Sequence, residues 1–174
     1  LWLSLPGVAN AHDGTGVLGG FISGFLHPIN GPDHMLAMIA VGLWGAILGR
    51  PLVIGLPMVF PAMMAVGGVM GIMALPLPPV EVGIAVSVLL LGSAIAFKVR
   101  PPVWAALLIV AIFAIFHGYA HGMELPSAAD PVGYSVGFVL STGLLHLVGI
   151  GIALAFEKTI GLKAVQVCGA VIGL

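Results

Sequence analysis

Charged side chains are scarce in this chain, and their scarcity excludes most classes of protein. Only 6% of the 174 residues are charged, whereas 60% are hydrophobic and the mean hydropathy is +1.23. A water-soluble domain carries roughly 25% charged residues, so this composition cannot cover a soluble surface. The net charge of −1 and the lack of a basic patch exclude a nucleic-acid partner. We therefore expect an all-α bundle of transmembrane helices surrounded by the lipid bilayer.

Cysteine is almost absent as well. The single cysteine, Cys168, cannot form a disulfide within the chain, and a lone thiol cannot build the thiolate-rich sites that hold Cu(I) or structural zinc. The glycine-rich phosphate loop with its lysine, which ATP-hydrolysing proteins carry, does not occur in the sequence. We therefore expect no ATP to be hydrolysed by this chain.

Residues 1–11 have the pattern of the end of a signal peptide. An apolar start leads to Ala9-Asn10-Ala11, which fits an A-x-A cleavage site. Cleavage there would place His12 and Asp13 at the mature N-terminus, where a free amine beside an imidazole could capture a metal ion. An ordinary signal junction with a solvated tail is the alternative, and the better supported one. We expect residues 12–174 to form a single transmembrane domain.

Four apolar runs are long enough, or nearly long enough, to cross a bilayer, which takes about 20 residues. A further apolar stretch covers residues 15–49 and is interrupted near its middle, and a last run begins near residue 162. We expect about six or seven helices, with a short or tilted helix over 15–26 meeting a helix over 33–49 at a break. The four uninterrupted runs cover residues 52–74, 80–98, 102–121 and 132–156.

The cations predict the orientation of these helices. All five Lys and Arg residues fall in alternate connections, so they share one side, which the positive-inside rule identifies as cytoplasmic. This pattern predicts a multi-pass membrane protein whose mature N-terminus lies outside the cytoplasm, which is the periplasm for a protein of the bacterial inner membrane. Asp130 and Pro131 fit the N-cap and first turn of the span that follows them. The five cations are Arg50, Lys98, Arg100, Lys158 and Lys163.

Glycines recur every four residues in three of the expected helices. Such faces let helix backbones approach each other closely in lipid. We expect tight helix packing, and the same faces offer a surface for oligomer contacts. The residues are Gly16, Gly20 and Gly24, then Gly67 and Gly71, then Gly133 and Gly137.

Two short polar segments interrupt the apolar sequence, and together they hold four of the six histidines. The first is His27–His34 and the second is His117–Glu124. Imidazole and carboxylate groups at apolar depth are costly unless a partner satisfies them, and they are ligands of divalent transition metals. A single buried histidine is more often a hydrogen-bonded structural group, but four histidines with two carboxylates favour a metal site.

The spacing within each segment predicts how the side chains are presented. His117, His121 and Glu124 fall on one face of a continuing helix. In the first segment, Pro32 suits the first turn of a helix, while His27 should end the preceding one, with an unwound stretch between them. The two segments should then meet at the outer face of the membrane. The predicted metal-site residues are His27, Asp33, His34, His117, His121 and Glu124.

For Asp33 and His146 the sequence fits two roles each. Asp33 fits either a metal ligand or an acceptor that orients an imidazole. His146 lies apart, roughly 22 Å of helix from the outer end of the last long run, with Thr142 one turn earlier. It fits either a second station on an inward ion route or a hydrogen-bonded packing histidine.

Both motifs carry a resemblance to a known family. His27-Pro-x-x-Gly-x-Asp33-His34-x-x-Ala-Met, followed by Val41-Gly42-Leu43-Trp44, and Phe116-His117-Gly-x-Ala-His121-Gly-x-Glu124 closely resemble the motifs of the HupE/UreJ family of membrane proteins. The likeness covers essentially the whole chain. It implies uptake of nickel, in some members cobalt, usually for hydrogenase or urease maturation. It also implies that the six predicted site residues are the family's motif residues.

We therefore expect a permease for Ni²⁺, with Co²⁺ or Zn²⁺ as other candidate ions, and not an enzyme. The ligand types do not select nickel, because copper binds such ligands more tightly and zinc comparably, so the preference for nickel rests on the resemblance. An alternative is an intramembrane metal-dependent hydrolase or oxygenase with Glu124 or Asp33 as general base. A further alternative is a metal sensor or storage subunit without transport.

Overall fold

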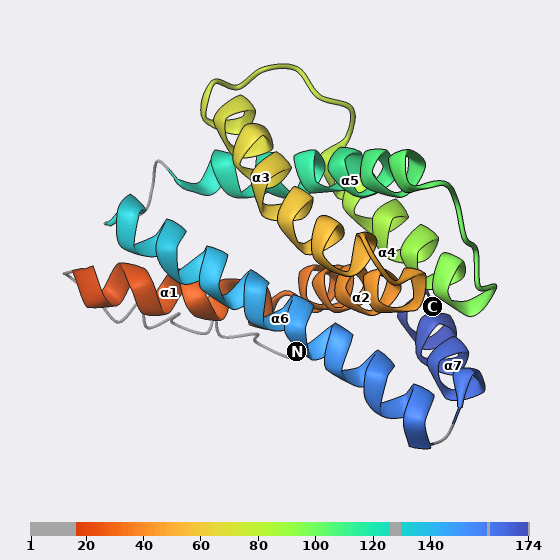
Figure 1. Cartoon of the computed structure of the whole chain (residues 1–174). Coiled ribbons are helices and arrows are strands. Elements are labelled where there is room, and N and C mark those ends of the chain that lie inside the picture. The colour runs from red at the N-terminus through yellow and green to blue at the C-terminus, as the bar shows by residue number, and fades with distance from the viewer. Residues whose placement is uncertain (1–16, 126–129, 160, 174) are drawn as a thin grey trace, which may run out of the picture.

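The structure is a computed structural model that describes residues 17–125, 130–159 and 161–173. Within these residues all regular elements are helices, seven in number, as the composition predicts (Figure 1). The predicted signal segment and the residues His12 and Asp13 lie outside the described residues. The helices are α1 (Val17–Asn30), α2 (Pro32–Leu48), α3 (Leu52–Ile72), α4 (Val80–Ala96), α5 (Val103–Glu124), α6 (Pro131–Thr159) and α7 (Leu162–Ile172).

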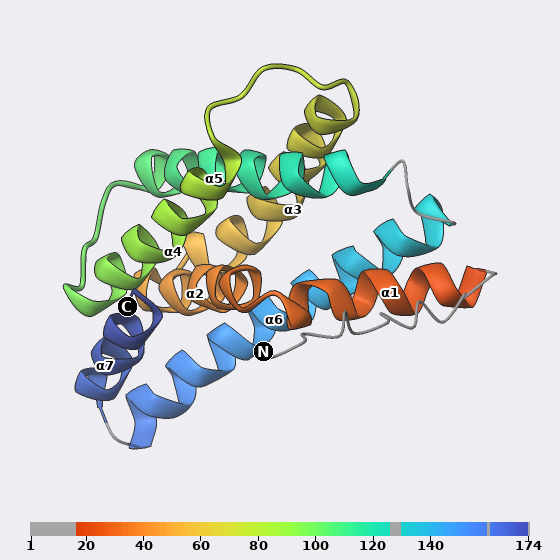
Figure 2. The ribbon, with the colours of Figure 1, turned by 180° about the vertical axis from the view of Figure 1, so that it is seen from behind.

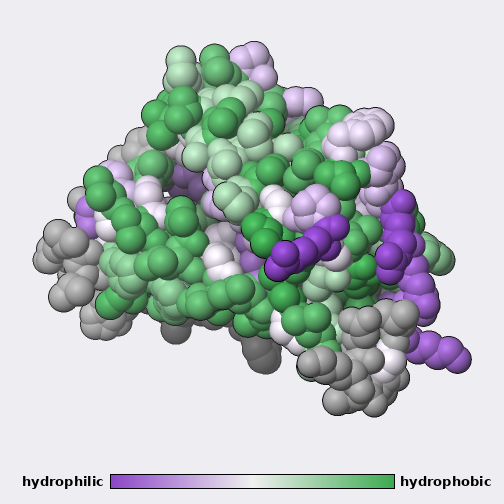
Figure 3. Space-filling model, viewed as in Figure 1, coloured by the Kyte–Doolittle hydropathy of each residue, from purple (hydrophilic) through white to green (hydrophobic). Residues whose placement is uncertain are grey.

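Three of these helices, α3, α5 and α6, are long and apolar enough to cross a bilayer, and α1 and α2 together form a fourth candidate span. Helix α4 has 17 residues, a rise of about 25 Å, and α7 is shorter still. Many large apolar side chains point outward from the bundle, as the mostly green surface in Figure 3 shows. The chain is thus a multi-pass membrane protein whose outer surface suits lipid.

The break between α1 and α2 is a single residue, Gly31. Pro32 opens α2 as predicted, and a proline disfavours the helical conformation for the residue before it. Gly31 accordingly has φ −92° and ψ 105°, and the two helices are bent by 80°. The prediction that His27 ends the first helix is wrong, because α1 continues through Pro28 to Asn30.

The helix persists there because a proline inside a membrane helix can be accommodated by its neighbours. The N–H of Gly31 donates to the carbonyl of His27 at 3.3 Å, and the N–H of Met35 donates to the carbonyl of Gly31 at 2.8 Å. The predicted unwound stretch is therefore reduced to a kink. Any ligand site at this break must be built mainly from side chains, since few backbone groups are released.

Glycines bring the helix backbones into direct contact, as their spacing predicts. A Cβ added at Gly67 of α3 would overlap the carbonyl oxygen of Ile115 on α5. A Cβ at Gly24 of α1 would overlap the carbonyl of Tyr134 on α6. Both views of the ribbon show α1 lying alongside the first half of α6, and α3 crossing α5 (Figure 1 and Figure 2).

Hydrogen bonds tie the connections together at each end of the bundle. At one end, Trp44 Nε1 donates to the carbonyl of Val99 at 3.2 Å, and Gln166 Nε2 donates to the carbonyl of Ala96 at 2.7 Å. The connections between α2 and α3, α4 and α5, and α6 and α7 lie here. We call it the cationic end because all five Lys and Arg residues lie in these connections or in the helix ends beside them: Arg50, Lys98, Arg100, Lys158 and Lys163.

The opposite end, where α1 meets α2 and α5 finishes, is called the histidine end below. There Tyr119 Oη donates to the carbonyl of Leu75 at 2.8 Å. The N–H of Gly133 donates to Asp130 Oδ1 at 3.1 Å, which confirms Asp130 as the cap of α6. Because successive connections lie at opposite ends of the bundle, the lysines and arginines gather at one end and the histidine segments at the other.

Replacing Gly67 by alanine should destabilise the bundle. The added methyl would meet the Ile115 carbonyl, and overpacking of this kind typically costs about 1–3 kcal/mol. A thermal unfolding series in detergent should show a lower midpoint for the Gly67→Ala variant. Gly143→Ala is the matched control, because a Cβ at Gly143 meets nothing within 4 Å. Equal midpoints for the two variants would contradict the packing described here.

Candidate metal centre

The two polar segments converge at the histidine end, although they are far apart in the sequence. The last turn of α1 carries His27, the first turn of α2 carries His34, and α5 carries His121 between them. The ring centroid of His121 lies 4.8 Å from that of His27 and 4.8 Å from that of His34. His117, one turn deeper on α5, lies 5.0 Å from His34. Four imidazoles from three helices therefore form one cluster.

Part of this cluster comes close to the spacing of a metal site. One ligand atom each from His27, His121 and Glu124 lie within 4.8 Å of one another. Glu124 Oε2 is 3.5 Å from His27 Nε2 and 3.9 Å from His121 Nδ1. Ligands of one ion with bonds of about 2.1 Å lie roughly 3–4 Å apart. Small side-chain rotations would bring these three atoms onto one ion.

Asp33 contacts an imidazole in this structure. Its Oδ1 accepts a hydrogen bond from the backbone N–H of His34 at 2.9 Å and lies 3.0 Å from His34 Nδ1. A carboxylate oxygen can only accept, so the ring proton of neutral His34 sits on Nδ1. The other nitrogen, Nε2, is buried and has no hydrogen-bond partner among the described residues. Its lone pair is available to a ligand.

His117 is oriented in a similar way, by a residue that was not predicted from the sequence. Ser87 on α4 is fully buried, and its hydroxyl donates to the carbonyl of Ile84 at 2.7 Å. Ser87 Oγ also lies 3.0 Å from His117 Nε2. Because the serine proton is used, Nε2 must be the donor in this second bond. His117 Nδ1 then carries the lone pair, and it too is buried without a partner in the described part of the chain.

Aromatic side chains from α3 and α6 enclose the cluster. Phe138 lies 4.3 Å from His121 between ring centroids, Tyr134 lies 5.7 Å from His27, and Phe60 lies 5.6 Å from His117. Neither these aromatic residues nor Ser87 were predicted from the sequence to belong to the site. Ser87 could have been noticed weakly, because it is a serine within an otherwise apolar run. The aromatic residues could not, because aromatic side chains are common in membrane helices whether or not they border a site.

The cluster is graded from exposed to buried. The Glu124 side chain is 59% exposed, that of His121 is 10% exposed, and His117 is completely buried. A cavity of about 590 Å³ opens beside the α1–α2 break and is lined by Ser23, Leu26, His27, Asn30, Gly31, Asp33 and His34. The two carboxylates, Asp33 and Glu124, are therefore the more exposed groups, and the imidazoles lead inward from them.

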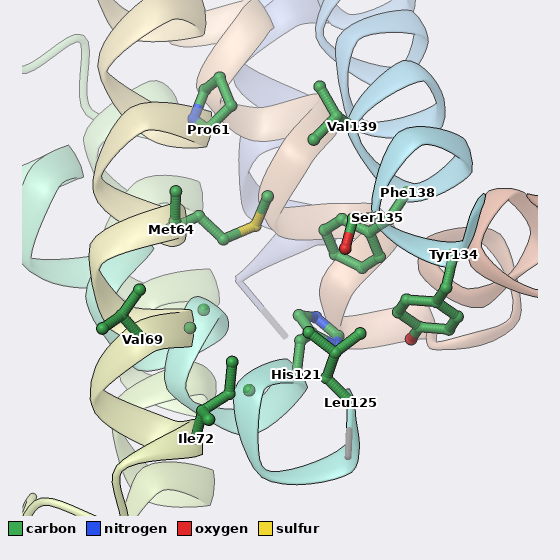
Figure 4. Close-up of a pocket in the computed structure, with 14 residues that line it drawn as sticks. Pro61, Met64, Val69, Ile72, His121, Leu125, Tyr134, Ser135, Phe138 and Val139 are labelled. Carbon is green, nitrogen blue, oxygen red and sulfur yellow. The ribbon is translucent and has the colours of Figure 1, made fainter. Parts of the chain in front are cut away.

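A second cavity, of about 250 Å³, reaches His121 from the side of the bundle, between α3, α5 and α6. Figure 4 shows His121 at its inner wall, with the Met64 side chain on α3 directed toward Phe138 on α6. Its lining is almost entirely apolar. The cluster is thus approached by a polar route at the break and an apolar route from the bundle's side.

His146 is not part of the cluster. It lies on α6 with Thr142, and its ring contacts Phe60, with centroids 5.3 Å apart. Of the predicted site residues within the described chain, the structure therefore brings together six and leaves His146 and Thr142 separate.

Two comparisons with known proteins identify the same family. The family model described as HupE / UreJ protein matches residues 1–174. The chain is 44% identical over 173 residues to Protein HupE of Rhizobium leguminosarum bv. viciae, a match that covers 99% of this chain and 90% of that protein. No solved structure matches. On this evidence, and with both motifs assembled at one end of the bundle, the chain belongs to the HupE/UreJ family.

Proposed function

We propose that the protein is a permease that takes up Ni²⁺, or alternatively Co²⁺, across the bacterial inner membrane, supplying hydrogenase or urease maturation. The observation that carries this proposal is the convergence of four imidazoles and two carboxylates at one end of a membrane bundle. Imidazole nitrogen and carboxylate oxygen suit such borderline divalent ions. The choice of nickel and of the maturation partners rests on the family resemblance.

Within this proposal, the residues have different roles. The ion would be bound by His27, His121 and Glu124, whose ligand atoms are the most closely grouped. His34 Nε2 and His117 Nδ1 would take the ion next, since both are buried and carry available lone pairs. Asp33 would act as the acceptor that orients His34, which the contact between Asp33 Oδ1 and His34 Nδ1 supports.

The direction of transport would follow the membrane potential. A doubly charged ion gains about 4–5 kcal/mol per 100 mV of inward-negative potential, which needs no ATP. The graded burial from Glu124 to His117 supports stepwise loss of water, since each deeper group replaces water with a nitrogen ligand. The mature N-terminus, with His12 and Asp13, remains a candidate for first capture of the ion.

One observation favours a metal-dependent enzyme as the second candidate. The apolar cavity between α3 and α6 ends at His121, so an apolar substrate could reach a bound ion from the lipid. Against this, the side chains lining that cavity offer few polar groups that could orient a substrate. Turnover measurements separate the candidates, because a permease moves ions whereas an enzyme or a store only retains them.

The His121→Ala variant should abolish nickel flux. Purified protein in lipid vesicles with an inside-negative potential should accumulate many radioactive nickel ions per chain, and the variant should accumulate none above empty vesicles. The reason is that His121, from the second segment, contacts both imidazoles of the first segment, His27 and His34. Met123→Ala is the control, because Met123 is 55% exposed in the same helical turn. Wild-type protein that only binds nickel, without flux, would defeat the proposal.

The Ser87→Ala variant should weaken nickel binding by about 10- to 100-fold, the usual effect of removing a group that orients a metal ligand. Without Ser87, the tautomer of His117 is no longer fixed by a hydrogen bond. Equilibrium dialysis would measure the affinity, and the visible spectrum of the Co²⁺-loaded protein would report the changed ligand geometry. Ser93→Ala, on the same helix, serves as the control. Unchanged affinity and spectrum in Ser87→Ala would remove Ser87 from the site.

A further inference from the structure

A second group of buried polar side chains lies deeper in the bundle than the histidine cluster. His146 lies fifteen residues after Pro131, or about 22 Å along α6. A Cβ at Gly42 of α2 would overlap the carbonyl oxygen of His146, so α6 touches α2 well beyond its first turn. His146 is therefore displaced from the cluster toward the cationic end.

The side chains of this group have no visible partner. His146 is 1% exposed, and neither of its ring nitrogens has a hydrogen-bond partner among the described residues. Thr142 is completely buried, and its Oγ1 likewise has none there. The two lie four residues apart and so share one face of α6. Burying unpaired polar groups is unfavourable, so this arrangement points to something that binds between them.

The group is connected to the histidine cluster through one aromatic ring. Phe60 contacts His117, with centroids 5.6 Å apart, and also contacts His146, with centroids 5.3 Å apart. His117 is the deepest imidazole of the cluster, and its Nδ1 is unpaired in the described structure. An ion leaving His117 would therefore find the nitrogen atoms of His146 as the next available ligands inward.

We propose that His146 and Thr142 form a second, weaker station for the divalent cation on its way toward the cationic end. This proposal rests on the proposed transport function. Among the described residues, the buried polar side chains are serines, threonine and histidines, with no carboxylate. One imidazole and one hydroxyl hold a divalent ion less firmly than the outer cluster. Conduction requires such a site, because an ion held too tightly cannot leave.

The test compares flux with binding in the full-length protein. His146→Gln keeps hydrogen-bonding groups but is a poor metal ligand, and Thr142→Val keeps the shape of threonine without its hydroxyl. Radioactive nickel uptake into vesicles measures flux, and equilibrium dialysis measures binding at the outer cluster. His146→Gln should lower flux by at least about tenfold, comparable with losing one group of a metal site, and leave binding within about twofold of wild type. Thr142→Val should show a smaller loss of the same kind.

Ser141→Ala is the matched control, since it removes a buried hydroxyl from the neighbouring position on another face of α6. It should transport at the wild-type rate. Undiminished flux in His146→Gln would overturn the second station. A parallel loss of flux and binding in His146→Gln would also overturn it, because it would indicate a packing role. If the wild-type protein showed no flux at all, the proposed function itself would fail, which is a distinct result.

Discussion

The site depends on how imidazoles are paired within an apolar bundle. A neutral imidazole has one donor and one acceptor nitrogen, and burial makes it costly to leave either without a partner. In His34 and His117, one nitrogen is engaged by a neighbour, the Asp33 carboxylate or the Ser87 hydroxyl. The other nitrogen of each is left with a lone pair. Two independent hydrogen bonds, one to His34 on α2 and one to His117 on α5, thus each fix which ring nitrogen carries the lone pair. The result is two oriented ligand atoms in adjacent rings.

The helix packing makes this arrangement possible. On α5, Gly118 and Gly122 alternate with the histidines, and a Cβ at either position would overlap the backbone of α3 at Met64 or Gly68. The glycine face of α5 therefore packs against α3, and its histidine face contacts the residues at the α1–α2 break. On the other side, glycines join α1 closely to α6. Helix α6 carries Tyr134 and Phe138, which we call the aromatic wall of the cluster. Close packing in lipid is what brings three separate histidine-bearing helices together.

Much of the fold and part of the candidate site could be predicted from the sequence, because membrane helices are recognised by their length and apolar composition. The helical spans, the cap at Asp130, the start of α2 at Pro32 and the one-face spacing of His117, His121 and Glu124 all follow from local rules. The unwound stretch after His27 was wrong, because a proline within a membrane helix does not have to end it.

The contact between Ser87 and His117 spans 30 positions of sequence, so local patterns cannot reveal it. The same holds for the aromatic wall around His27 and His121, since its residues come from another helix. What local rules leave out is how the helices rotate about their axes when they pack. That rotation decides which serine or aromatic faces a given imidazole, and only tertiary structure supplies it.

An anomalous-scattering map of nickel-soaked crystals would test the central claim most directly. The account predicts a single strong peak at the histidine end, within bonding distance of His27, His121 and Glu124, with His34 Nε2 and His117 Nδ1 facing it. No peak at that end, with each imidazole instead hydrogen-bonded to protein groups, would contradict the account.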